Sequence, residues 1–109
     1  MIKLTSDNFV REVEEYKGLV VIDLFADWCG PCRMLAPILD ELESELEFVK
    51  FCKINVDEEP QLTSLFKVES IPTVALVKDN TLMDFSVGYV TKEKLKEFIL
   101  SYKDVENEN

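Results

Sequence analysis

The sequence predicts an α/β fold with a central mixed five-stranded sheet flanked by four helices. Short apolar runs alternate with segments whose apolar residues recur at helical spacing. One run, residues 19–25, is apolar on both faces, which is typical of a central parallel strand. Short connections and right-handed crossovers then place helices on both faces of the sheet. We interpret residues 1–109 as a single domain that is large enough to bury a hydrophobic core, and residues 104–109 as its polar tail.

The first half of the chain alternates strand and helix signals. Residues 2–4 fit a short edge strand, and Thr5 is expected to cap a helix that ends near Gly18. After the strand at residues 19–25, a second helix begins around residue 29 and carries Leu and Ile at helical spacing. Pro37 lies inside that helix, and its missing amide hydrogen is expected to kink it. The inward residues of the first helix are expected to be Phe9, Val10, Val13 and Tyr16.

The second half continues the alternation and ends in a hairpin and a helix. Residues 48–56 form a predicted third strand, and Pro60 fits the first turn of a short helix. A fourth strand at residues 73–77 leads through the turn Asp79-Asn80 into an antiparallel fifth strand at residues 82–87. Thr91 is expected to cap the last helix. The buried stripe of that helix is predicted to be Leu95, Phe98, Ile99 and Tyr102.

The charge balance excludes some classes of partner. The formal net charge is −10, with 22 acidic against 12 basic residues. Nucleic acid and anionic membrane surfaces carry the same sign, so neither is an expected partner. No apolar run is long enough to span a bilayer and the N-terminus has no signal segment, so we expect a cytoplasmic protein. The chain has no histidine, which removes the commonest general base and metal ligand.

Two of the three cysteines, Cys29 and Cys32, lie three residues apart directly after the buried strand. One turn of helix brings both sulfur atoms onto the same face, so the pair is interpreted as a dithiol–disulfide redox centre. A zinc site would need four ligands, and the chain offers three cysteines and no histidine. Cys52 falls in the predicted third strand, where a buried inert thiol is favoured and a regulatory thiol is the alternative.

Separated groups of residues carry a family resemblance over nearly the full length of the chain. The residues are Asp23, Trp28-Cys29-Gly30-Pro31-Cys32, Pro37, Lys53, Ile71-Pro72-Thr73 and Val87-Gly88. With these residues in this order, on these predicted elements, the chain resembles the thioredoxin family. The resemblance implies a thioredoxin-like fold and a general protein-disulfide reductase. The Gly30-Pro31 pair between the cysteines further resembles the reducing branch of the family.

The order of the two thiols follows from their places on the helix. Cys29 stands at the helix start, where backbone N–H groups and the helix dipole favour a thiolate, so it is predicted to be the exposed, attacking thiol. Cys32 lies one turn deeper and is expected to be more buried and protonated until it attacks Cys29. Without a histidine, Asp23 is the plausible general base, with a pKa raised by burial. The alternative for Asp23 is a hydrogen-bonded group at a strand end.

The resemblance adds further residues and partners. It implies that Lys53 lies near Asp23, and that Pro72 is a cis-proline holding Ile71 beside Cys29; a trans turn is the alternative. It also implies no bound cofactor, electrons supplied by a thioredoxin reductase that draws on NADPH, and disulfide-containing protein substrates. We expect a monomer, although a structural subunit without turnover is the rival to a reductase. Tyr89, where the family usually has a small residue, is expected to narrow the groove or add a stacking contact. The predicted substrate patch is Trp28, Gly30, Pro31, Ile71, Pro72, Val87 and Gly88.

Overall fold

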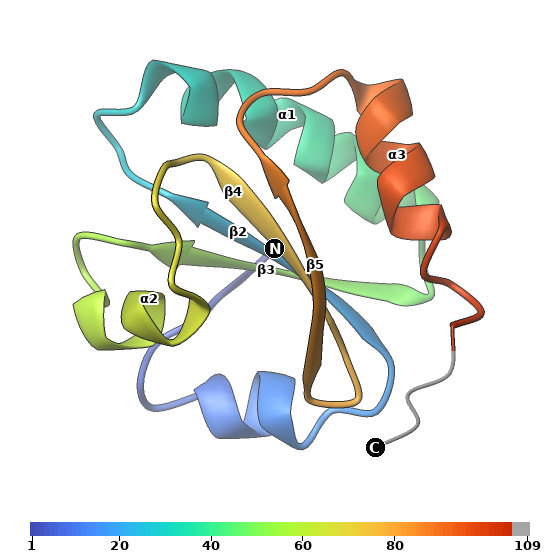
Figure 1. Cartoon of the computed structure of the whole chain (residues 1–109), viewed down its shortest axis with the longest axis horizontal. Coiled ribbons are helices and arrows are strands. Elements are labelled where there is room, and N and C mark those ends of the chain that lie inside the picture. Colours follow the sequence, from blue (N-terminus) through green and yellow to red (C-terminus); the bar gives the residue numbers. More distant parts are fainter. Residues whose placement is uncertain (106–109) are drawn as a thin grey trace.

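The computed structural model describes residues 1–105, so most of the predicted polar tail lies outside the described residues. The α/β fold is confirmed, with five strands, three α-helices and one π-helix in the predicted order (Figure 1). The elements are β1 (Ile2–Lys3), η1 (Val10–Glu14), β2 (Leu19–Phe25), α1 (Gly30–Glu45), β3 (Val49–Asn55), α2 (Pro60–Phe66), β4 (Thr73–Lys78), β5 (Thr81–Val87) and α3 (Lys92–Leu100).

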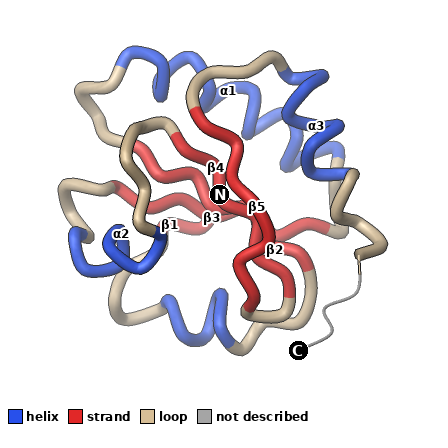
Figure 2. The backbone as a smooth tube through the Cα atoms, in the orientation of Figure 1, coloured by secondary structure: helices blue, strands red, loops and turns tan. Residues whose placement is uncertain are grey.

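The five strands form one mixed sheet in the order β1-β3-β2-β4-β5 (Figure 2). β3 pairs in parallel with both β1 and β2, whereas β4 pairs antiparallel with β2 and with β5. β2 is therefore the central strand, as its apolar character on both faces predicts. Its register places Asp23 between Lys53 of β3 and Val74 of β4.

The sheet separates two hydrophobic cores, one on each face. Because side chains alternate along a strand, Val20, Ile22 and Leu24 contact the core beneath η1 and α2. Leu19 and Val21 contact the other core, beneath α1 and α3. Figure 1 shows α1 and α3 together on one side of the sheet, with α2 and the short η1 coil away from them. The alternation places Asp23 on the α1 side.

The first predicted helix is wrong in type and in extent. η1 is a five-residue π-helix, closed by a hydrogen bond from Glu15 N to Val10 O at 2.8 Å. Val10 points outward and is 50% exposed, although Phe9 and Val13 are buried as expected. Two contacts join this segment to distant parts of the chain. The Phe9 ring packs edge-on against Phe66 at 6.1 Å, and Lys50 Nζ donates to the Glu12 carbonyl oxygen at 3.0 Å.

Thr5 caps the turn that leads into this segment, as expected. Its Oγ1 accepts a hydrogen bond from Asp7 N at 3.2 Å, and its own N–H donates to Asn8 Oδ1 at 2.8 Å. Phe9 N donates to Thr5 O at 3.1 Å, so helical hydrogen bonding starts at Thr5, one turn before η1 itself begins. The chain reaches β2 through Gly18, whose N–H donates to Asp79 Oδ1 at 2.8 Å. The first connection is thus held to the hairpin turn on the other side of β2.

The remaining elements follow the sequence patterns closely. α1 continues through Pro37, which is exposed, and buries Leu35, Leu39 and Leu42; the kink stays a prediction. Asp79 and Asn80 form the hairpin turn with positive φ angles of 49° and 64°. The cap of α3 is confirmed.

In α3, Thr91 Oγ1 accepts from Lys94 N at 3.3 Å, and Leu95 and Ile99 are buried. Phe98 and Tyr102 are half-buried at the edge of the same core. Within residues 1–105, none of the helices combines the length and the apolar character that a bilayer crossing requires.

Candidate redox site at the start of α1

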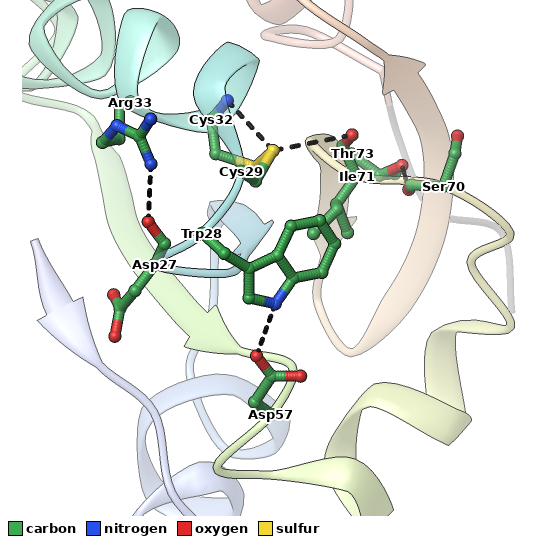
Figure 3. Close-up of a disulfide and its surroundings, with 9 residues drawn as sticks. All are labelled: Asp27, Trp28, Cys29, Cys32, Arg33, Asp57, Ser70, Ile71 and Thr73. Carbon is green, nitrogen blue, oxygen red and sulfur yellow. Dashed lines mark hydrogen bonds between the residues drawn. A yellow bond between two sulfur atoms is a disulfide. The ribbon is translucent and has the colours of Figure 1, made fainter.

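The two cysteines of the motif form a disulfide at the junction of β2 and α1. Cys29 and Cys32 are bonded through their sulfur atoms, with Cα atoms 5.2 Å apart. Cys29 is the N-cap residue of α1, and its Sγ accepts a hydrogen bond from the backbone N–H of Cys32 at 3.2 Å (Figure 3). The helix therefore presents a backbone donor and its positive end to this sulfur.

The predicted difference in exposure between the two cysteines is wrong for this oxidised state. Cys29 is 4% exposed and Cys32 is 3% exposed. Both pack in a small apolar cluster with Ala26, against Phe25, Val56 and Ile71. The side chain of Cys29 is covered because the loop carrying Ile71 closes over it. What distinguishes the two sulfur atoms is their surroundings, because Cys29 adjoins that loop whereas Cys32 lines a cavity shared with Asp23.

Asp23 is a buried carboxyl on the α1 side of the sheet. Among the described residues, its Oδ1 has no hydrogen-bond partner. Burial raises the pKa of this carboxyl to about 7, and the positive charge of Lys53 acts in the opposite direction. No protein group among the described residues hydrogen-bonds this oxygen, so any partner it has must come from the adjoining cavity.

A cavity of about 210 Å³ connects Asp23 with Cys32. It is large enough for several water molecules, and a water there could hydrogen-bond the free oxygen of Asp23. This cavity was not predicted from the sequence. Neither was the position of Asp40, which lies one helical turn after Ala36 and lines the cavity as well. Its walls are Met1, Asp23, Phe25, Ala26, Asp27, Cys32, Arg33, Ala36, Asp40 and Lys53.

The loop before β4 closes the other side of the disulfide. The Ile71–Pro72 peptide bond is cis, and Ile71 O lies 3.9 Å from Cys29 Sγ. A disulfide sulfur carries no hydrogen, so in this oxidised state the pair is a contact. Thr73 Oγ1 donates to Ser70 O at 2.7 Å, and Gly88 N donates to Pro72 O at 2.7 Å. These bonds hold the carbonyl of Ile71 beside the reactive sulfur.

The residues of the predicted substrate patch differ in how far they reach the surface. Trp28 is 69% exposed, and Pro31, Val87 and Tyr89 are also exposed. Gly30, Ile71 and Gly88 are half-buried, whereas Pro72 is buried and was wrongly expected at the surface. A groove of about 420 Å³ runs beside Trp28 and Ile71. Sequence reasoning missed its other walls, which are Val56, Thr63, Val68, Glu69 and Ser70.

Comparison with known proteins identifies this arrangement. The family model described as thioredoxin matches residues 1–101. The chain belongs to the thioredoxin family. The thioredoxin of Listeria monocytogenes is 44% identical over 104 residues, covering 94% of this chain and 99% of the relative. That of Bacillus subtilis is 41% identical over 100 residues, covering 91% and 94%. That of Chlamydia muridarum is 40% identical over 104 residues, covering 94% and 100%.

Membership of the thioredoxin family settles the chemistry of the cysteine pair. Cys29 and Cys32 form a redox-active centre that cycles between dithiol and disulfide. The protein is a protein-disulfide oxidoreductase, and thiol–disulfide exchange at this centre is its reaction. The expectation of this activity from the sequence is confirmed.

The third cysteine lies outside this thioredoxin-family site. Cys52 is a free thiol on β3, fully buried in the core beneath η1 and α2. Burial raises its pKa to about 12, so the thiol stays protonated. The predicted burial is confirmed. Across residues 1–105, no three His, Cys, Asp or Glu side chains are grouped in a way that could hold a metal ion.

Proposed function

We propose that this thioredoxin-family protein reduces the disulfides of other proteins, with Cys29 as the attacking thiol and Cys32 as the resolving thiol. One observation carries the assignment of the two roles. Cys29 Sγ, not Cys32 Sγ, accepts the backbone N–H at the start of α1. In the dithiol state this donor and the helix dipole favour the thiolate of Cys29, which lowers its pKa relative to an ordinary cysteine.

The exchange takes two steps that balance in electrons and protons. The Cys29 thiolate attacks one sulfur of a substrate disulfide, forms a mixed disulfide and releases the other sulfur as a thiolate. Cys32 then loses its proton and attacks Cys29 Sγ. This step closes the Cys29–Cys32 disulfide and releases the second substrate thiolate. Two electrons pass to the substrate, and the protein is left in the oxidised state seen here.

Asp23 is proposed to accept the proton from Cys32. Both groups line the same 210 Å³ cavity, so a water between them can relay the proton. A pKa of about 7 lets Asp23 accept a proton and return it to solvent near neutral pH. Lys53 lines the cavity as well and lowers the pKa of Asp23 by its charge, so we assign it a site-tuning role.

The groove and patch around Cys29 are proposed to bind the substrate. Trp28, Val87 and Tyr89 offer exposed side chains, and the carbonyl of Ile71 is placed to accept a hydrogen bond from an extended substrate segment. Gly88 allows close approach of that segment. Gly30, Pro31 and Pro72 act as site-tuning residues, because they shape the backbone on which the two sulfur atoms are held.

The remaining features of the proposal concern the protein's partners and surroundings. We propose that a thioredoxin reductase returns the disulfide to the dithiol with electrons from NADPH, and that the protein itself binds no cofactor. The buried free thiol of Cys52 fits the reducing conditions of a cytoplasm. We propose that residues 1–109 act as a monomeric single domain, which the two continuous cores across residues 1–105 support.

Trapping experiments test the assignment of the two thiols. Cys32→Ser is expected to accumulate a mixed disulfide between Cys29 and a disulfide-bonded protein substrate, seen on a non-reducing gel. Cys29→Ser is the matched control and is expected to trap none. Alkylation of the reduced protein at neutral pH is expected to modify Cys29 before Cys32. Modification of Cys32 first, or trapping by Cys29→Ser, would refute the proposed roles.

A further inference from the structure

The groove beside Cys29 has an aromatic wall that is held in place by an acidic residue. Trp28 Nε1 donates a hydrogen bond to Asp57 Oδ2 at 2.9 Å, and Figure 3 shows the carboxylate at the edge of the indole ring. The bond fixes the orientation of a ring that is otherwise 69% exposed. An exposed tryptophan face held next to a carboxylate is a favourable place for a cation, since the ring attracts it through its π-electrons.

The groove itself is lined by an acidic residue. Glu69 lines the groove with Ser70 and Ile71, on the loop that leads to β4. Within residues 1–105, no ion pair or hydrogen bond occupies the carboxylate of Glu69. Asp57, through its bond to Trp28, and Glu69, as a lining residue, therefore place negative charge at the groove beside Trp28 and Ile71.

The nearby cations do not neutralise this groove. Arg33 Nη1 donates to the carbonyl oxygen of Asp27 at 2.7 Å, on the far side of Trp28 from Asp57 (Figure 3). Lys53 lines the cavity behind Cys32. Lys67 does not line the groove; it lines a neighbouring cavity of about 200 Å³, which Glu69 borders as well. The groove itself is lined by Trp28 and Glu69 without a cationic side chain.

We propose that this groove selects protein disulfides that have an arginine or lysine close to the cysteine that Cys29 attacks. The substrate cation lies over the indole of Trp28, where it is attracted by the carboxylate of Asp57 bonded to that ring and by the carboxylate of Glu69 in the same groove. The inference rests on the proposed function and deepens it, because it names the class of segment that the reductase prefers. Opposite charges across the groove raise the rate of encounter and orient the substrate.

Two disulfide-bonded peptides of equal length test the proposal. One carries arginine two residues from the attacked cysteine, and the other carries citrulline, an uncharged side chain of nearly the same shape. The second-order rate constant for reduction by the reduced protein is measured for each. The arginine peptide is expected to react about two- to five-fold faster at low ionic strength. The ratio is expected to fall towards one at about 1 M salt, where charges are screened.

Three charge-removing variants locate the effect. Asp57→Asn keeps an oxygen that can accept from Trp28 Nε1, and Glu69→Gln keeps the side-chain length; each is expected to lower the arginine-to-citrulline ratio. Glu97→Gln removes the same charge from an exposed site on α3 and is expected to leave the ratio unchanged. Equal rates for both peptides, or an equal loss in Glu97→Gln, would overturn the proposal. If neither peptide is reduced, the proposed function itself fails.

Discussion

Asp23 and Lys53 occupy the same register position on the adjacent parallel strands β2 and β3, yet no ion pair within 4 Å joins them. Lys53 Nζ instead lies 5.9 Å from the centre of the Phe25 ring. Lys53 therefore lowers the pKa of Asp23 only at a distance, and burial remains the larger effect on that pKa. A carboxyl that is only partly compensated is suited to exchange its proton near neutral pH.

The first prediction concerns the stability of the fold. The pKa of Asp23 rises from an ordinary 3.8 to about 7 in the fold. Between these values the unfolded chain loses the proton first, so the free energy of unfolding falls as pH rises towards 7. Asparagine does not ionise, so Asp23→Asn removes this loss of unfolding free energy. We expect the oxidised variant to be more stable than the wild type at pH 8, by on the order of 4 kcal/mol.

Denaturant unfolding of the oxidised protein measures this difference. The gap between Asp23→Asn and wild type is expected to close below about pH 3, where Asp23 is protonated in both the folded and the unfolded chain. The same variant is expected to reduce disulfides more slowly at neutral pH. Asp40→Asn, an exposed carboxylate at the same cavity, serves as the control and is expected to move neither quantity. A lower midpoint for Asp23→Asn at pH 8 contradicts the buried, ionisable carboxyl.

The second prediction isolates the effect of Lys53. Lys53→Gln removes the positive charge that lowers the pKa of Asp23, so this pKa is expected to rise above about 7. The measurement is an NMR titration of the Asp23 carboxyl carbon in the reduced and oxidised proteins. Lys94→Gln removes a charge from an exposed site on α3 and is expected to leave the pKa of Asp23 unchanged. A pKa that stays constant or falls in Lys53→Gln would show that Lys53 does not act on Asp23.

The third prediction compares two glycines next to the site. Gly88 has a φ of +83°, a left-handed conformation in which a side chain is strained, although its Cβ would contact nothing within 4 Å. Gly88→Ala is therefore expected to destabilise the fold by about 1 kcal/mol through the backbone alone. Gly30 begins α1 without a positive φ, and its Cβ would lie 3.9 Å from the end of the Arg33 side chain.

Gly30→Ala is the matched control for Gly88→Ala. Alanine favours the helix over glycine, so the variant is expected to be as stable as the wild type, or about 0.5–1 kcal/mol more stable. Thermal or denaturant unfolding of the oxidised proteins gives both values. Similar losses in the two variants would mean that the φ of Gly88 is not the cause.

The fourth prediction concerns Cys52. Its thiol is fully buried and has a pKa of about 12, so both access and ionisation oppose its reaction. Iodoacetamide at pH 8 is expected to label two cysteines of the native reduced protein, and a third only after denaturant is added. Mass spectrometry of the labelled protein counts them. A third label that appears on the native protein as fast as the first two would favour the regulatory alternative.

Parts of the fold with strong local signals could be predicted to within a residue or two. β2 spans the predicted residues 19–25. A strand that is apolar on both faces is stable only where both faces are covered, which is at the centre of the sheet. Thr91 caps α3 and Asp79-Asn80 form the hairpin turn, since both signals depend on neighbouring backbone atoms. The order of the elements around Cys29 and Cys32 could also be predicted, and so could the place of Asp23 in the strand before them, because these features follow from local sequence patterns.

Features that depend on distant contacts could not be predicted. The spacing of Phe9 and Val13 suits an ordinary helix, whereas the segment forms a π-helix that contacts the distant residues Phe66 and Lys50. The burial of Cys29 depends on the loop at Ile71, 42 residues away in the chain. The bond between Trp28 and Asp57 joins residues 29 apart, and neither residue carries a local signal of it.

The alternation of side chains along β3 affects which disulfide can form when the protein is oxidised. With three cysteines a chain could close three different bridges, and two of them would inactivate it. Cys52 points to one side of the sheet, whereas Cys29 and Cys32 lie beyond its far end at the start of α1. The sheet therefore keeps the Cys52 thiol away from the other two sulfur atoms. We therefore expect oxidation to close the same Cys29–Cys32 disulfide in each catalytic round.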